Sequence, residues 1–202
     1  MHLHRTPPRK EDIAELEPFE GLGLDRISLV TNLAEATEAL EVLMLAGELG
    51  FDTESKPTFR KGERSTGPHV LQFATAERAY IFQSHVEECL PVVMRLLESG
   101  DVKKIGFGLS GDLSHIAARF GIRPSSVVDL DSSFRRLGYR NAVGAKSAIA
   151  ILFQQRMMKS KTTTTSNWSS HNLSERQLMY AANDAYAAIR VFHAMREGGQ
   201  VS

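Results

Sequence analysis

This sequence has a single cysteine, no net charge and no long apolar run. It contains one cysteine, Cys89, so no disulfide can form within the chain, which fits a reducing, cytoplasmic environment. No apolar run approaches the ~18 residues that a membrane-spanning helix needs. Residues 1–8 lack the apolar segment of a secretory signal, so we expect neither export nor a membrane partner.

The formal net charge is zero, with 24 basic and 24 acidic residues in a chain of 202. A protein that coats nucleic acid non-specifically is usually basic overall, so this balance argues against that class. An enzyme is not excluded, because the charges are unevenly placed. Basic residues gather in three clusters, at 60–64, 135–146 and 156–161.

The pattern of apolar residues predicts one folded domain with short flanking segments. Residues 1–24 hold three of the seven prolines and show no sustained period, so we expect an extended or partly disordered arm there. The domain is expected over 25–197 and a short tail over 198–202. Strands alternate with amphipathic helices inside it, and 69–82 has the pattern of a hairpin. This order predicts an α/β domain with a mixed sheet of about five to six strands flanked by helices.

Two acids stand one residue apart in an apolar strand, at Asp52 and Glu54. Side chains alternate along a strand, so both carboxylates lie on one face. They repel each other unless something neutralises them, and hard cations such as Mg²⁺ prefer carboxylate oxygens. An isolated pair of this kind is more often a solvated feature of an edge strand. The hypothesis of a metal site therefore requires further acids.

Two later elements supply such acids. Asp112 lies in the first turn of an expected helix, where the helix dipole favours a carboxylate whatever its function. Asp184 lies in the middle of the last helix, four residues after Tyr180, so the two share a face, with small residues between them. Four acids and a tyrosine are the composition that a two-metal phosphodiester site needs. Asp129 and Asp131 are spare acids nearby, and we interpret His171 as structural.

Three segments resemble the exonuclease motifs of the DEDD family, in the same order and at similar spacing. They are F-D-T-E at 51–54, G-F-G-L-S-G-D-L at 106–113 and Y-A-A-N-D-A-Y-A at 180–187. Tyr180 resembles the tyrosine of the DEDDy branch, which includes ribonuclease D and the Werner-type exonuclease domain. The other branch would have histidine at the position of Met179. The resemblance extends over roughly residues 27–195.

The resemblance implies a ribonuclease H-like fold and a metal-dependent 3′–5′ exonuclease. Such an enzyme hydrolyses nucleic-acid phosphodiester bonds from the 3′ end and releases nucleoside 5′-monophosphates by a two-metal mechanism. It implies that Asp52, Glu54, Asp112 and Asp184 hold two divalent ions, Mg²⁺ or Mn²⁺, and that Tyr180 positions the attacking water. Its implied substrate is single-stranded or 3′-recessed DNA or RNA.

Substrate contacts are expected around the first two motifs. In the family, side chains just after the first motif and on the helix of the second lie near the terminal base. The matching positions are Thr58 or Phe59, and His115 or Ile116. Gln72 and the basic loop that begins at Arg60 are placed to contact phosphates. The candidate substrate contacts are Thr53, Thr58, Phe59, Arg60, Gln72 and His115.

Two other functions fit the same residues. One is a nucleic-acid-binding adaptor that keeps the fold but does little chemistry, and the other is a phosphatase that acts on small nucleotides. The sequence indicates neither a protein partner nor a choice between DNA and RNA, since a 2′-hydroxyl is recognised by a few local hydrogen bonds.

Overall fold

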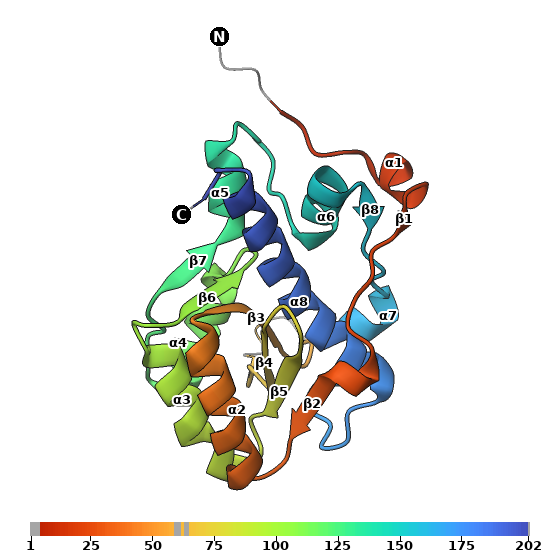
Figure 1. Cartoon of the computed structure of the whole chain (residues 1–202). Coiled ribbons are helices and arrows are strands. Elements are labelled where there is room, and N and C mark those ends of the chain that lie inside the picture. Colours follow the sequence, from red (N-terminus) through yellow and green to blue (C-terminus); the bar gives the residue numbers. More distant parts are fainter. Residues whose placement is uncertain (1–4, 59–61, 63–64, 202) are drawn as a thin grey trace.

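A six-stranded mixed sheet with helices on both faces forms the centre of the molecule (Figure 1). The structure is a computed structural model that describes residues 5–58, 62 and 65–201. The strand order is β2-β5-β4-β3-β6-β7. The strands are β2 (Ile27–Val30), β3 (Glu48–Glu54), β4 (Val70–Ala74), β5 (Ala79–Gln83), β6 (Lys103–Gly106) and β7 (Val127–Asp129). The predicted α/β class with five to six strands is confirmed.

The sheet is antiparallel at its centre and parallel toward both edges. β3, β4 and β5 form a meander that includes the expected hairpin, and β4 pairs antiparallel with both neighbours. β2 joins β5, β6 joins β3 and β7 joins β6, all in parallel. The crossover after β5 therefore places β6 beside β3, the strand that carries Asp52 and Glu54.

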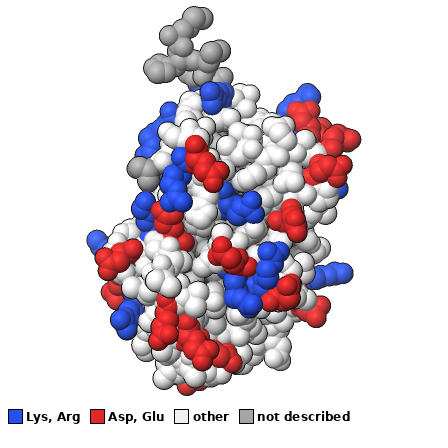
Figure 2. Space-filling view, in the orientation of Figure 1, with Lys and Arg blue, Asp and Glu red and all other residues white. Residues whose placement is uncertain are grey.

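Each face of the sheet packs against its own set of helices. One face packs against α2 (Leu33–Ala46), α3 (Leu90–Glu98) and α4 (Ser110–Phe120), together with η2 (Glu87–Cys89). The other face packs against α5 (Leu130–Arg136), α6 (Ala145–Phe153) and α8 (Glu175–Glu197). Because side chains alternate along β3, Phe51 faces the first layer while Gly50 faces α8. Acidic and basic side chains are interspersed over the surface shown in Figure 2.

Helix α8 lies unusually close to β3. Its buried face is built from small residues, including Ala181 and Ala185, and a Cβ added to Gly50 would lie only 2.7 Å from the carbonyl carbon of Ala185. The helix begins with a capping box, the pattern that serine followed three residues later by glutamine predicts: the Ser174 hydroxyl accepts from the Gln177 backbone and the Gln177 side chain accepts from the Ser174 backbone. Together these features hold Asp184 against the strand.

The N-terminal arm differs from its expectation as an extended or partly disordered segment. Its described residues contain α1 (Lys10–Ala14), β1 (Glu17–Pro18) and η1 (Leu24–Arg26), and β1 pairs in parallel with β8 (Gln155–Arg156). Leu22 is only 1% exposed, so burial holds the arm on the domain. The polar segment 159–171, whose composition is typical of a loop, also contains a short helix, α7 (Lys161–Thr164), beside the buried Trp168. None of the helices in the described ranges is long and apolar enough to cross a membrane.

Candidate active site

Three of the four predicted acids converge where β3 meets α8. Asp52 and Glu54 extend from one face of β3, and Asp184 extends from α8 toward them. One carboxylate oxygen from each residue lies within 4.8 Å of the other two. Asp184 is only 5% exposed. Carboxylates this close can share a single cation.

The fourth acid, Asp112, lies in the first turn of α4 on the opposite face of β3. The Thr53 hydroxyl points to that face and donates a hydrogen bond to the Asp112 carboxylate. Thr53, a predicted substrate contact, therefore links Asp112 to the strand between the other two acids. The negative charge of Asp112 contributes to the raised pKa of Asp52.

The carboxylates hold protons more tightly than isolated acids do. Burial raises the pKa of Asp52 well above its usual range, and the charges of Asp184 and Asp112 add to the effect. Burial, followed by the charge of Asp52, raises the pKa of Glu54 to about 9. Burial also raises the pKa of Asp184, against the opposing charge of Lys159. The site therefore requires added positive charge before all its acids can ionise at neutral pH.

Lys159 is a component of the site that sequence reasoning missed. Its Nζ lies 2.7 Å from Asp184 Oδ2 and 5.4 Å from the centroid of the Tyr180 ring. Burial alone would lower the pKa of Lys159, but Asp184, Tyr180 and Asp52 together outweigh burial and raise this pKa. The only sequence signal was a third basic cluster, which is more often a solvated surface feature. The contact with Asp184 follows from the path of the chain before α7.

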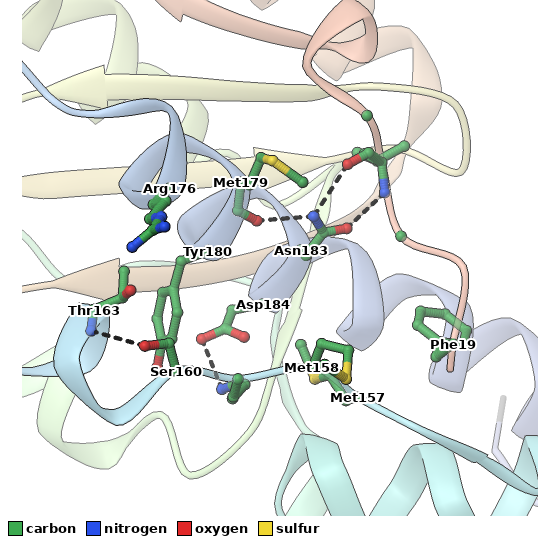
Figure 3. Close-up of a pocket in the computed structure, with 14 residues that line it drawn as sticks. Phe19, Met157, Met158, Ser160, Thr163, Arg176, Met179, Tyr180, Asn183 and Asp184 are labelled. Atoms are coloured by element: carbon green, nitrogen blue, oxygen red, sulfur yellow. Dashed lines mark hydrogen bonds and ion pairs between the residues drawn. The ribbon is translucent and has the colours of Figure 1, made fainter. Parts of the chain in front are cut away.

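Tyr180 lies one turn before Asp184 on α8, and both side chains point to the same side of the helix (Figure 3). Its hydroxyl is 2.9 Å from the Thr164 hydroxyl, and its ring lies 5.8 Å from that of Trp168. The Trp168 Nε1 donates to the Thr164 carbonyl at 3.3 Å, which ties α7 to this aromatic pair. Burial raises the pKa of Tyr180 to about 12, so the phenol remains protonated at neutral pH and can donate a hydrogen bond.

The residues present fit a divalent metal. Oδ1 of Asp184 is buried without a hydrogen-bond partner among the described residues, as are both side-chain polar atoms of Gln72. Gln72 pairs with Asp52 across the β3–β4 ladder, so its side chain lies on the same face as the carboxylates. Unsatisfied oxygens and crowded carboxylates are a donor set that suits hard cations such as Mg²⁺ and Mn²⁺.

The other predicted substrate contacts are scattered around this centre. Thr58 is exposed beyond the end of β3, and His115 is half-buried on α4 one turn after Asp112. Gln72 is fully buried, so any contact it makes is inside the site. Phe59 and Arg60 lie outside the described residues.

The spare acids have structural partners. The Asp129 carboxylate accepts hydrogen bonds from the backbone of Gly108 and Leu109, at 2.9 and 3.0 Å. It thereby holds the loop that leads into α4. Asp131 accepts from the backbone of Val143 at 2.9 Å. His171 stacks on His85, with the ring centroids 4.1 Å apart.

Comparisons with known proteins place this geometry among exonucleases. Residues 27–200 match a family model described as a 3′–5′ exonuclease. The chain is 28% identical over 156 residues to the mouse bifunctional 3′–5′ exonuclease/ATP-dependent helicase WRN, covering 76% of this chain and 11% of that protein. It is 28% identical over 154 residues to an Arabidopsis thaliana 3′–5′ exonuclease, covering 74% and 52%. The chain thus spans 52% of the length of the Arabidopsis relative and 11% of the length of mouse WRN.

Solved structures show the same fold. The Aedes aegypti Nibbler EXO domain superposes with a TM-score of 0.74 at 20% identity, covering 89% of this chain and 92% of that one. Escherichia coli RNase D superposes with a TM-score of 0.70 at 18% identity, covering 86% and 46%. The expected ribonuclease H-like architecture is confirmed by these neighbours.

Proposed function

Because this chain belongs to the 3′–5′ exonuclease family, we propose that it is a metal-dependent enzyme that shortens nucleic acid from the 3′ end. The products are nucleoside 5′-monophosphates. The observation that carries the proposal is the convergence of Asp52, Glu54 and Asp184, whose oxygens lie within 4.8 Å of one another. A protein that only bound nucleic acid would have no need of three crowded acids, because they repel phosphate.

We propose that Asp52, Glu54, Asp112 and Asp184 hold two divalent ions, Mg²⁺ or Mn²⁺. When bound, the ions supply Lewis-acid stabilisation of the charge that develops on the phosphate oxygens. The carboxylates orient and retain the ions, and the raised pKa of Glu54, about 9, means that loading displaces protons from the site. The Thr53 hydroxyl fixes the position of Asp112 relative to β3.

Tyr180 orients the attacking water by donating or accepting a hydrogen bond. A phenol with a pKa of about 12 is not a base at neutral pH, so its role is orientation rather than proton removal. Thr164 holds the phenol oxygen from α7. The ammonium group of Lys159 lies next to Asp184, and its positive charge favours the approach of the nucleic-acid backbone.

The proposed substrate is single-stranded or 3′-recessed DNA or RNA. The names of the relatives point to nucleic acid, but they include both a helicase-linked exonuclease and RNase D. We propose that residues 25–197 form the catalytic domain, with 1–24 as an arm and 198–202 as a tail. Cys89 is buried and unpaired, which supports a cytoplasmic location.

The test is digestion of matched, labelled DNA and RNA strands with Mg²⁺ or Mn²⁺. We expect release of 5′-monophosphates that stops in chelator and falls by at least about 10²–10³-fold in Asp184→Asn, because a charge needed in the transition state is lost. Asp101→Asn, at an exposed position remote from the carboxylates, serves as the matched control and retains activity.

Three results would decide against this function. Metal-dependent release that persists in both Asp52→Asn and Asp184→Asn would show that these carboxylates are not the metal site. Chelator-independent binding without any release would identify an adaptor. Hydrolysis of short diesters without preference for a long strand would identify a phosphatase.

A further inference from the structure

Two arginines line a cavity on the side of α8 away from the carboxylates. Arg190 follows Asp184 by six residues, which places it about 9 Å farther along the helix axis and about 120° around it. The N-terminal arm passes α8 on its way to β2 and brings Arg26 to the same place (Figure 1). The cavity between them has a volume of about 340 Å³. Its other lining residues are Phe19, Glu20, Phe153, Gln155 and Tyr186, so it includes none of the candidate metal ligands.

Neutral groups hold both guanidinium groups in place. Arg190 Nη1 donates to the Tyr186 hydroxyl at 2.6 Å, and Arg190 Cζ lies 5.5 and 5.8 Å from the ring centroids of Tyr186 and Phe153. Arg26 Nη2 donates to the Gly21 carbonyl at 3.1 Å. A guanidinium that stacks on aromatic rings is pre-organised, so it loses little freedom when its remaining N–H groups bind a ligand. The cavity therefore presents two fixed sets of hydrogen-bond donors.

The positive charge of these two arginines is not balanced by the protein. Within the described ranges neither Arg26 nor Arg190 forms an ion pair with a carboxylate, although both are half-buried. Glu20 is the only acid among the described residues that line the cavity, and its side chain is exposed. Two arginines against one glutamate leave a net charge of +1. A charge that is partly removed from water is costly unless an opposite charge compensates it, so the cavity suits an anion.

The donors fit a phosphate better than a carboxylate. The planar fork of a guanidinium matches the oxygens of either group bidentately. A carboxylate occupies one fork, whereas a phosphate monoester carries a charge of about −1.5 to −2 at neutral pH and has three acceptor oxygens, enough for two forks. A phosphodiester of the nucleic-acid backbone carries one charge and has fewer free oxygens. The volume also lies within the ~300–1,000 Å³ of small-molecule sites, so there is room for more than the phosphate.

We propose that this cavity binds a phosphate monoester, supplied either by a free nucleoside 5′-monophosphate or by the 5′-phosphate at the end of a strand. Arg26 belongs to the arm and Arg190 to α8, so the bound phosphate bridges the two and stabilises the folded protein. Phe19, Glu20 and Arg26 precede residue 27, where the match to the exonuclease family begins. The site does not depend on the proposed reaction, because none of its residues belongs to the carboxylate centre.

The test is a calorimetric titration of the full chain with AMP in chelator, which keeps divalent ions out of the carboxylate site. We expect saturable binding and a midpoint of urea unfolding that rises with AMP concentration. Arg26→Met and Arg190→Met should each weaken binding about tenfold or more, because hydrogen bonds to a charged group are lost. Glu20→Gln should strengthen binding by up to about fivefold, because it removes a like charge at an exposed position. Arg123→Met, at an exposed position outside the cavity, is the matched control and should bind as the wild type does.

Two copies of one short strand, with and without a 5′-phosphate, distinguish the sources of the monoester. Competition with AMP by the phosphorylated strand alone would show that a strand end enters the cavity. Competition by neither strand would assign the cavity to a free nucleotide. Both results support a monoester site, and adenosine, which lacks the phosphate, should bind far more weakly than AMP.

Four results would overturn the inference. They are the absence of AMP binding in the millimolar range, equal affinity for adenosine and AMP, wild-type AMP affinity in both arginine variants, and weaker binding in Glu20→Gln. Arg190→Met removes packing on Phe153 and Tyr186, so the unfolding midpoint of each variant is also measured without ligand. Glu20→Gln changes an exposed side chain and tests the site without disturbing the fold. Because the titration is done in chelator, a failure of the proposed nuclease activity would leave its outcome unchanged.

Discussion

Replacing Gly50 with alanine tests how closely α8 must approach β3 for the carboxylates to meet. A Cβ at this position would lie 2.7 Å from the carbonyl carbon of Ala185 and 3.1 Å from the backbone nitrogen of Ile189, with the Ala185 carbonyl oxygen closer still. These are backbone atoms of a helix, so no side-chain rotation relieves the contact. Ordinary contact begins near 3.4 Å, so the carbonyl carbon alone requires the helix to retreat by about 0.7 Å, the difference between 3.4 and 2.7 Å, and the closer carbonyl oxygen requires more.

That retreat has two measurable consequences. Overpacking of this kind costs typically about 1–3 kcal/mol, which should lower the midpoint of urea unfolding. Asp184 immediately precedes Ala185 and moves with it away from Asp52 and Glu54. Because mutating the groups that orient metal ligands typically reduces metal affinity by about 10–100-fold, we expect a loss of that size in a calorimetric titration with Mn²⁺.

Gly100→Ala is the matched control, since a Cβ there meets no atom within 4 Å. It should leave both the unfolding midpoint and the Mn²⁺ affinity unchanged. If Gly50→Ala unfolded at the wild-type midpoint and bound Mn²⁺ with wild-type affinity, close packing of α8 on β3 would not determine the metal site.

Two further predictions concern charge in the site. Glu54 has a pKa of about 9 in the folded protein against 4.5 normally, so its stabilising effect is complete below pH 4.5 and is lost as the pH rises toward 9. In chelator the free energy of unfolding should fall across this range, less so in Glu54→Gln, and an equal slope in both proteins would refute the assignment. Lys159→Met leaves the buried Asp184 carboxylate without its partner and should cost about 1–3 kcal/mol in chelator at pH 8. Mn²⁺ should restore much of that loss, and an equal deficit with and without Mn²⁺ would contradict a shared site.

Local features of the fold were predictable from neighbouring residues. The Ser174–Gln177 capping box, the hairpin between β4 and β5 and the class of the sheet all depend on residues close in sequence. The arm was not predictable in this way. Its main attachment joins Leu22 to Asn183, 161 positions apart, and nothing near either residue indicates the other.

In the candidate site, too, some residues were predictable from short motifs and others were not. The motif spacing identified Asp52, Glu54, Asp112, Asp184 and Tyr180 as candidates, and their catalytic roles stay predictions. Neither Lys159 beside Asp184 nor Thr164 beside Tyr180 was indicated by any motif. A lysine in a polar segment is usually solvated, so its type and spacing carry little information about a buried ion pair.

The sequence by itself determined most elements of residues 25–197, the family and the identity of the acids, because periodicity and capping depend on nearby residues and each motif is a short segment in a recognisable order. Only the tertiary structure decided how those acids meet, that Lys159 lies beside Asp184 and that the N-terminal arm attaches to α8. These depend on the distance between β3 and α8 and on the path of two segments far apart in the chain. The short distance is possible because Gly50 has no side chain. This property matters only once α8 packs against β3.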